Sequence, residues 1–250
     1  TGNPFAIQEI ADALKGVKVP VLVKNPINPE LNLWIGAIER LKEVGIENLV
    51  GIHRGFFAYK NSKYRNIPQW QIAIDLKKKF PELPMICDPS HITGNSAFIY
   101  EIAQKAMDMN FDGLMIETHN DPKNALSDSE QQITPAELEK TLKKLVVRNF
   151  DSENENFKSS LKQLRIQIDD FDIELLEILK RRMDLVKKIA IHKKENKVTI
   201  LQNDRWLEML KTRTKYGTEN GLSEQFVQDL LKAIHQESID KQNSVMNLKK

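Results

Sequence analysis

Two groups of polar residues in the first 150 positions could carry chemistry. Lys24 and Arg54 are cations that can hold a phosphate group, the lysine as a point charge and the arginine through its planar fork. His91, Glu117 and Asp128 form a set of one imidazole and two carboxylates, which suits a divalent metal such as manganese, iron or zinc better than magnesium or calcium. A metal beside a phosphate-binding pair indicates carbonyl activation on a phosphorylated substrate.

A second set of candidate residues lies in the last hundred positions. Arg182 and Lys193 are eleven residues apart, almost a whole number of turns, so they share one helix face. Arg165 lies roughly 25 Å from Arg182 along a helix axis, and in a dimer it could enter only a partner's site. Ser238 and Gln242, at i and i+4, also share a face. The alternative is that these are solvated helix residues.

The elements that must position the first set follow the pattern of a parallel α/β fold. Apolar runs at 20–24, 48–53, 84–87 and 113–117 predict strands, and amphipathic stretches at 32–44, 69–80, 96–109 and 135–147 predict helices. Ligands bind at the carboxyl ends of parallel strands. We therefore predict that four strand ends share one site: Lys24, His53-Arg54, Asp88 to His91, and Glu117 to His119. The alternative is that these are solvated loop residues.

Composition indicates two architectures in one chain. All ten prolines and eight of the ten glycines lie at or before Pro135.

The net charge of +2 argues against a nucleic-acid binder, and no apolar run approaches the roughly 20 residues of a membrane span. The single Cys87 excludes an intramolecular disulfide framework and fits a cytoplasmic location. The chain begins at Thr1 within a predicted loop, so we expect a fragment or a processed terminus.

The last hundred residues are predicted to be helical. No glycine or proline occurs from Asp151 to Lys197, and apolar residues recur every three or four positions, which predicts one helix of about 40 residues and about 60 Å. Such a helix is too long to be buried in a small monomer, so an intertwined homodimer is expected. Shorter helices are predicted at 202–215 and from Ser223. The polar stretch 149–156 is a linker or the first helical turn, and the expected domains are 1–148 and 149–250.

The first part resembles the 3-deoxy-D-arabino-heptulosonate 7-phosphate (DAHP) synthase family. The resemblance covers roughly residues 1–145 and rests on Val-Leu-Val-Lys-Asn around Lys24, Gly-Ile-His-Arg-Gly around Arg54, Cys-Asp-Pro-Ser-His ending at His91, Glu-Thr-His from Glu117, and Ala-Leu-Ser-Asp ending at Asp128. It implies a (β/α)8 TIM barrel that condenses phosphoenolpyruvate with erythrose 4-phosphate in aromatic amino acid biosynthesis. It also implies phosphoenolpyruvate binding by Lys24 and Arg54, and manganese, iron, zinc or cobalt held by His91, Glu117 and Asp128.

This resemblance has one important departure. The family's fourth metal ligand, a cysteine on an early strand, and its Lys-Pro-Arg segment have no counterpart, because Cys87 directly precedes Asp88 in a later strand. The chain is therefore expected to contain the last four of eight βα units. Half a barrel leaves strand edges unpaired, and we predict that this chain alone is inactive as a synthase.

The second part resembles the all-helical chorismate mutase family. The matching strings are Gln-Leu-Arg-Ile-Gln-Ile-Asp-Asp-Phe-Asp around Arg165, Lys-Arg-Arg-Met around Arg182, His-Lys-Lys around Lys193, Asp204-Arg205, and Ser238 with Gln242. The resemblance implies a three-helix domain that converts chorismate to prephenate without a cofactor. Many relatives have aspartate at Gln202, which contacts the substrate hydroxyl, and glutamate or glutamine at Trp206, so both positions depart from the family.

The roles that this second resemblance implies are specific. Arg165 of a partner chain and Arg182 would clamp the two carboxylates, Lys193 with Gln242 would donate to the ether oxygen, and a further group would orient the ring and hydroxyl: Arg205, Gln202 and Ser238. Two alternatives stay open. The helical domain could be a dimerising regulatory module that binds chorismate or prephenate and inhibits the synthase, or a scaffold without a ligand.

Overall fold

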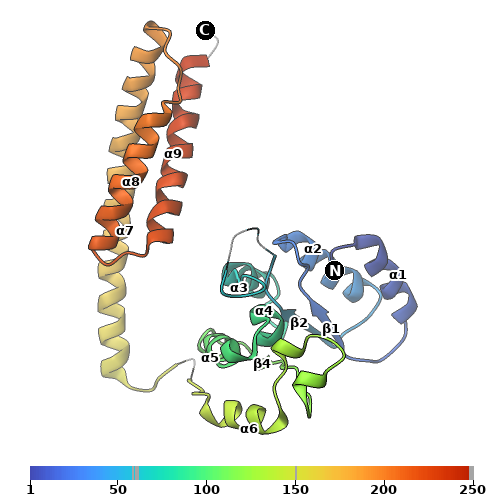
Figure 1. The fold of residues 1–250 in the computed structure, drawn as a ribbon. Coiled ribbons are helices and arrows are strands. Elements are labelled where there is room, and N and C mark those ends of the chain that lie inside the picture. The colour runs from blue at the N-terminus through green and yellow to red at the C-terminus, as the bar shows by residue number, and fades with distance from the viewer. Residues whose placement is uncertain (58, 60–61, 150, 248–250) are drawn as a thin grey trace. The chain divides into compact units, whose positions relative to one another are not determined.

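The computed structural model describes residues 1–57, 59, 62–149 and 151–247. These fall into two units, Thr1–Asp151 and Ser152–Lys250, and each is described by itself. The sequence predicted a boundary after residue 148, three residues before the division between the units. Figure 1 shows a sheet with surrounding helices in the first unit and a group of helices in the second.

The first unit contains a parallel sheet in the order β1-β2-β3-β4, formed by β1 Val21–Lys24, β2 Leu49–His53, β3 Met85–Cys87 and β4 Gly113–Leu114. Because all four run in one direction, their carboxyl ends lie at one edge. The predicted fourth strand, 113–117, is too long. Its ladder ends at Leu114, and Thr118 pairs instead with Ile133, so the chain turns away from the sheet before Glu117.

The predicted helices of this unit are confirmed within a few residues. They are α2 Leu31–Glu43, α3 Trp70–Lys79, α5 Ile99–Asp108 and α6 Pro135–Lys144, with 3-10 turns at Ser96–Phe98, Pro122–Asn124 and Ser129–Gln131. Two helices were not predicted, α1 Pro4–Leu14 and α4 Pro89–Thr93. The second is too short to show a helical period. It begins because Asp88 Oδ1 accepts a hydrogen bond from the His91 N–H at 3.0 Å, with proline at the first helical position.

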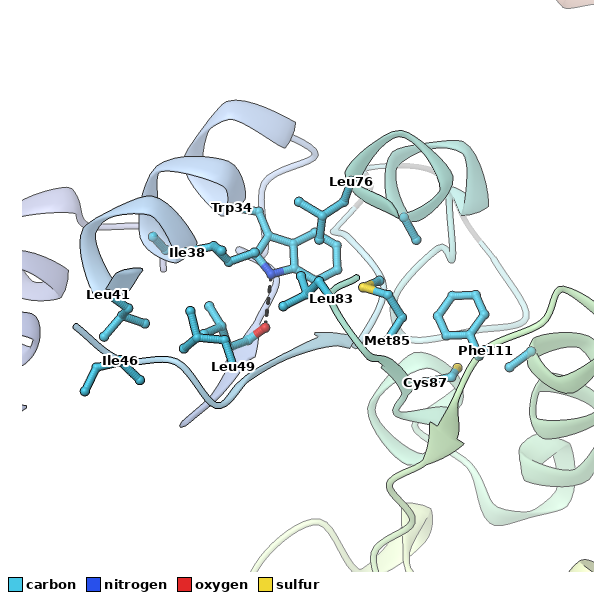
Figure 2. Close-up of a cluster of buried hydrophobic side chains, with 14 of the residues drawn as sticks. Trp34, Ile38, Leu41, Ile46, Leu49, Leu76, Leu83, Met85, Cys87 and Phe111 are labelled. Atoms are coloured by element: carbon cyan, nitrogen blue, oxygen red, sulfur yellow. Dashed lines mark hydrogen bonds between the residues drawn. The ribbon is translucent and has the colours of Figure 1, made fainter. Parts of the chain in front are cut away.

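One face of the sheet carries the core (Figure 2). Trp34 of α2 is fully buried there, and its Nε1–H donates to the Val23 carbonyl at 3.0 Å, which ties the helix to β1. Leu49 and Met85 lie on the same face and pack in the same cluster. Leu22 points to the opposite face, because neighbouring strand residues alternate, and it is 44% exposed. The packed face fixes the strands, and hence the polar groups at their ends.

The described residues of the second unit form three helices, as predicted. They are α7 Glu155–Glu195, which has 41 residues, α8 Asn203–Glu219 and α9 Glu224–Asn247. Asn154 caps α7 by accepting a hydrogen bond from the Phe157 N–H at 3.1 Å. Only the last two positions of the stretch 149–156 therefore belong to the helix, and residue 150 lies outside the described residues.

The long helix is packed along only part of its length. Val186 and Ala190 are buried in its second half, whereas the first half extends past α8 and α9 (Figure 1). Apolar side chains in that first half are exposed, with Leu164 at 57% and Phe171 at 66%. None of the described helices combines the length and the apolar character that crossing a membrane requires.

Candidate active sites

A chain of contacts joins three strand ends in the first unit. Asp88 is fully buried, and its Oδ2 accepts a hydrogen bond from Lys24 Nζ at 3.0 Å and lies 2.8 Å from His91 Nδ1. The opposite ring atom, His91 Nε2, lies 3.5 Å from Glu117 Oε1. Burial alone would raise the pKa of Asp88, but hydrogen bonds from His91 and Lys24 hold this pKa below its ordinary value. Asp88 is therefore an anion that orients a cation and an imidazole.

Arg54, which follows β2, adds the fourth strand end to the group around Asp88. Its backbone N–H donates to Asn25 Oδ1 at 2.6 Å, and the Asn25 amide in turn donates to the carbonyls of Pro26 and Gly55, so the loop after β2 is fixed to the loop after β1. Burial lowers the pKa of the Arg54 guanidinium, and the negative charge of Asp88 opposes that effect. Lys24 and Arg54 thus place two positive charges around one buried carboxylate.

Two residues that the sequence did not single out connect the carboxylates. Arg65 Nη1 donates to Asp128 Oδ1 and to Gln131 Oε1, both at 2.8 Å. Gln131 is 1% exposed, and its Nε2 donates to Glu117 Oε2 at 2.8 Å. Asp128 has a left-handed backbone with φ +50°, an uncommon conformation for a residue other than glycine. Arg65 and Gln131 therefore determine how Glu117 and Asp128 are aimed.

The predicted metal ligands fit a metal only in part. His91 faces Glu117 while Asp88 lies at its other ring nitrogen, an arrangement that orients metal-binding histidines. The carboxylate of Asp128, in contrast, is paired with Arg65. Within the described part of the chain, no three His, Cys, Asp or Glu side chains converge as a metal site requires. The structure brings two of the three predicted ligands together.

Replacing Gln131 tests the link between these carboxylates. Gln131→Leu removes both amide contacts and leaves polar groups of Arg65 and Glu117 without this partner, so we expect a loss of about 1–3 kcal/mol in the free energy of unfolding. Urea unfolding in a Trp206→Phe background, in which Trp34 and Trp70 are the remaining tryptophans, measures it by their emission. Gln132→Leu is the matched control, because Gln132 makes one exposed contact to the Ser127 carbonyl. An equal loss in both variants would contradict the role of Gln131.

His53 does not belong to the strand-end site, and its inclusion there was wrong. Lys24 is opposite Ile52 in the sheet, so the next residue, His53, points to the other face. It is fully buried among aromatic rings whose centroids lie 5.2 to 6.5 Å away: Trp34, Phe56, Trp70 and Phe111. Burial lowers its pKa from 6.5 to about 3, against smaller opposing effects of the Pro68 backbone and Asp88.

This buried imidazole predicts an acid-sensitive first unit. The unfolded chain binds the His53 proton more readily than the folded chain between pH 6.5 and 3, so the stability contribution is complete above about pH 6.5 and is lost as pH falls through that range. From pH 7 to pH 5, we expect the wild type to lose about 2 kcal/mol more than His53→Phe. Urea unfolding at both pH values measures this difference. A His119→Phe control should keep the wild-type pH dependence.

In the second unit, the structure gathers three of the predicted residues between α7 and α9. Arg182 Nη1 donates to Ser238 Oγ at 2.6 Å, and Gln242 Nε2 donates to the Ser238 carbonyl at 3.3 Å. Ser238 and Gln242 are buried, and within the described residues the Gln242 Oε1 atom has no hydrogen-bond partner. Burial lowers the pKa of the Arg182 guanidinium. Ser238 therefore joins a half-buried cation to a buried amide group whose oxygen has no partner among the described residues.

The other predicted residues lie around this group without joining it. Lys193 Nζ donates to the Ile200 carbonyl at 2.5 Å, so it lies against the segment between α7 and α8, and burial lowers its pKa. Gln202 precedes α8 and is exposed. Arg205 pairs with Glu208 at 2.6 Å. Arg165 is exposed on the first half of α7.

An aromatic pair stands beside Arg182. The rings of Trp206 on α8 and His235 on α9 stack, with centroids 4.0 Å apart and planes 11° apart. Burial lowers the pKa of His235, and the positive charge of Arg182 lowers it further. The sequence singled out Trp206 but not His235. The available signal was its spacing, because His235 lies three residues before Ser238 on the same helix face.

Comparisons with known proteins assign each unit to a family. A model of the DAHP synthetase I family matches residues 6–151, and a model of type II chorismate mutases matches residues 164–243. A 4-amino-4-deoxychorismate mutase from Streptomyces venezuelae is 32% identical over 91 residues, which cover 36% of this chain and 87% of that protein. The chain belongs to both families. It is a fusion of a DAHP synthetase unit with a chorismate mutase unit.

The relatives that match the DAHP synthetase unit are matched over a smaller fraction of their own length. A phospho-2-dehydro-3-deoxyheptonate aldolase from Thermotoga maritima is 25% identical over 114 residues, 46% of this chain and 33% of that protein. A 2-dehydro-3-deoxyphosphooctonate aldolase from Helicobacter pylori is 49% identical over 87 residues, 30% of this chain and 31% of that protein. The chain thus spans about a third of the length of these aldolases.

Proposed function

We propose that the chorismate mutase unit converts chorismate to prephenate in aromatic amino acid biosynthesis. The observation that carries this proposal is the half-buried Arg182 beside the buried Ser238 and Gln242, whose amide oxygen has no hydrogen-bond partner among the described residues. The rearrangement needs no nucleophile and no obligatory proton transfer. A protein can therefore accelerate it by fixing the reactive conformer and by stabilising the charge that separates in the transition state, without a cofactor.

Each predicted site residue of this unit has a role in that scheme. Arg182 binds one substrate carboxylate through its guanidinium, and Ser238 holds the guanidinium in position. Lys193 donates to the ether oxygen as its bond to carbon breaks, together with the Gln242 amide group. Gln202 and Arg205, at the start of α8, orient the ring and its hydroxyl.

We further propose that this site is completed by a second copy of the chain. Arg165 lies on the exposed first half of α7, where apolar residues such as Leu164 and Phe171 are also exposed. Pairing that half with another α7 would bury this apolar surface and carry Arg165 to the partner's Arg182. The homodimer is therefore part of the proposed catalytic unit.

For the first unit, we propose the condensation of phosphoenolpyruvate with erythrose 4-phosphate, carried out by a complete synthase barrel. Lys24 and Arg54 bind the phosphate and carboxylate of phosphoenolpyruvate. His91 and Glu117, with Asp128, are the residues that would hold manganese, iron, zinc or cobalt, which when bound polarises a carbonyl group. Metal titration followed by the unfolding temperature, in the wild type and in His91→Ala, tests this without an activity assay.

We expect one of the two units to be enzymatically active in this 250-residue chain and the other to be inactive. We expect that the chain consumes chorismate, which is measured by the ultraviolet absorbance of this substrate. We expect no condensation of phosphoenolpyruvate with erythrose 4-phosphate above background, because the four strands of the described residues cannot close a barrel. A separate assay, with a five-carbon aldose phosphate in place of erythrose 4-phosphate, should look for 2-dehydro-3-deoxyphosphooctonate, the compound in the names of the Helicobacter relatives. Condensation by the chain alone would contradict the second expectation.

The alternative is that the helical unit only regulates the synthase. It is less well supported, because the Streptomyces relative is named as a mutase and the match covers 87% of its length. Binding of chorismate without turnover would favour regulation. We also propose a cytoplasmic protein whose partners are small molecules and a second copy, with neither nucleic acid nor membrane among them.

A further inference from the structure

The stacked pair of Trp206 and His235 suggests a role that the family resemblance does not supply. His235 and Ser238 are three residues apart on α9, and Ser238 accepts the hydrogen bond of Arg182. Arg182 is also close enough to affect the charge state of the imidazole. Trp206 lies four residues after Gln202, near the start of α8, so it stands at the end of the site assigned to the ring hydroxyl.

The side chains of the Trp206–His235 pair differ from those that relatives have at the position of Trp206. An indole ring can donate a hydrogen bond but cannot accept one, so Trp206 cannot replace the acidic or amide side chain that is common in relatives. A neutral imidazole has one donor and one acceptor nitrogen. The stack fixes the plane of the His235 ring, whose hydrogen-bonding nitrogens lie at the ring edge, outside the stacked face.

We propose that His235, held flat against Trp206, is a substrate-binding residue that hydrogen-bonds the ring hydroxyl of chorismate and sets specificity for it. This inference rests on the proposed mutase function. Trp206 is the positioning residue, because it acts by orienting His235. A substrate that carries an ammonium group in place of the hydroxyl meets the positive charge of Arg182 and no carboxylate at positions 202, 206 and 235. The site therefore selects chorismate over 4-amino-4-deoxychorismate.

The test uses the full chain and both substrates. His235→Leu should lower kcat/KM for chorismate roughly ten-fold, mainly through KM, and should narrow the preference over 4-amino-4-deoxychorismate. His235→Gln, which can still donate and accept, should recover most of the loss. Trp206→Leu should give a similar loss, and Trp206→Phe, which keeps a ring beneath the imidazole, should recover it. His192→Leu is the control, because that imidazole is 78% exposed.

A binding signal separates this inference from the mutase function itself. Trp206 is the only tryptophan in the second unit, so the difference in emission between the wild type and Trp206→Phe isolates it. Chorismate should change this emission in the wild type and change it much less in His235→Leu. Emission that responds without turnover would contradict the mutase function but support the role of His235. Three results would overturn the inference. They are an unchanged preference for chorismate in His235→Leu, a kcat/KM of that variant within two-fold of the wild type, and no change in the emission of the wild type on adding chorismate.

Discussion

Replacing Lys193 with alanine is expected to lower the kcat of chorismate conversion by about 10²–10³-fold, with a much smaller change in KM. The ether oxygen gains negative charge only as its bond breaks, so a cation aimed at it stabilises the transition state more than the bound substrate. Lys193 is suited to this role because it is partly removed from water and is held at the Ile200 carbonyl, beside the segment that leads to Gln202. Steady-state kinetics on the full chain measure both constants.

The next residue provides the control for this prediction. Lys194 Nζ donates to the Val245 carbonyl at 3.3 Å at an exposed position, and it points to a different side of α7. Lys194→Ala should therefore leave kcat within two-fold of the wild type. A rise in KM without a change in kcat in Lys193→Ala would show that Lys193 only binds the substrate, and would contradict its role at the ether oxygen.

Mixing two inactive variants is expected to restore activity. Arg165→Ala and Arg182→Ala should each lose at least about 10²-fold in kcat/KM, because each leaves a substrate carboxylate without its charged partner. In a mixed dimer, one site lacks both arginines and the other has both. Unfolding and refolding the two variants together at equal concentration should therefore recover about a quarter of the wild-type activity.

This experiment tests two points together: whether the protein is a dimer, and whether Arg165 enters the site of the partner chain. Arg182→Ala mixed with Arg182→Lys is the control, because both variants lack the same guanidinium and no mixed dimer contains a complete site. Sedimentation of the wild type checks that two chains associate. Activity that stays at the level of the separate variants after mixing, in a sample shown to be dimeric, would place Arg165 outside the partner's site.

The sequence predicted most elements because their periods are long enough to read. The alternation of apolar runs with amphipathic stretches located β1 to β3 and four helices, and the absence of glycine and proline located α7. The five-residue α4 was missed because it covers little more than one turn. The fourth strand was predicted too long, because the pairing of Thr118 with Ile133 that draws the chain away depends on tertiary structure.

The sites were predictable to different degrees. Residue type and strand position were sufficient to bring Lys24, His91 and Glu117 into one group. The contact of Arg65 with Gln131 was not predictable, because 66 residues separate the two and neither lies in a strand. His53 could have been excluded, since the residue before a site-facing strand end points to the opposite face. In α9, spacing was sufficient to pair Ser238 with Gln242.

The strand order has a consequence for how the first unit forms during synthesis. Each strand pairs with the one made just before it, so the sheet can grow strand by strand as the chain leaves the ribosome and closes one helical crossover at each step. The polar cluster cannot form in the same gradual way. Lys24 and Arg54 precede Asp88 in the chain, so their buried counter-charge arrives only when Asp88 is made, directly after β3. Completion of the third strand is therefore the step at which this half of the molecule acquires its electrostatic centre.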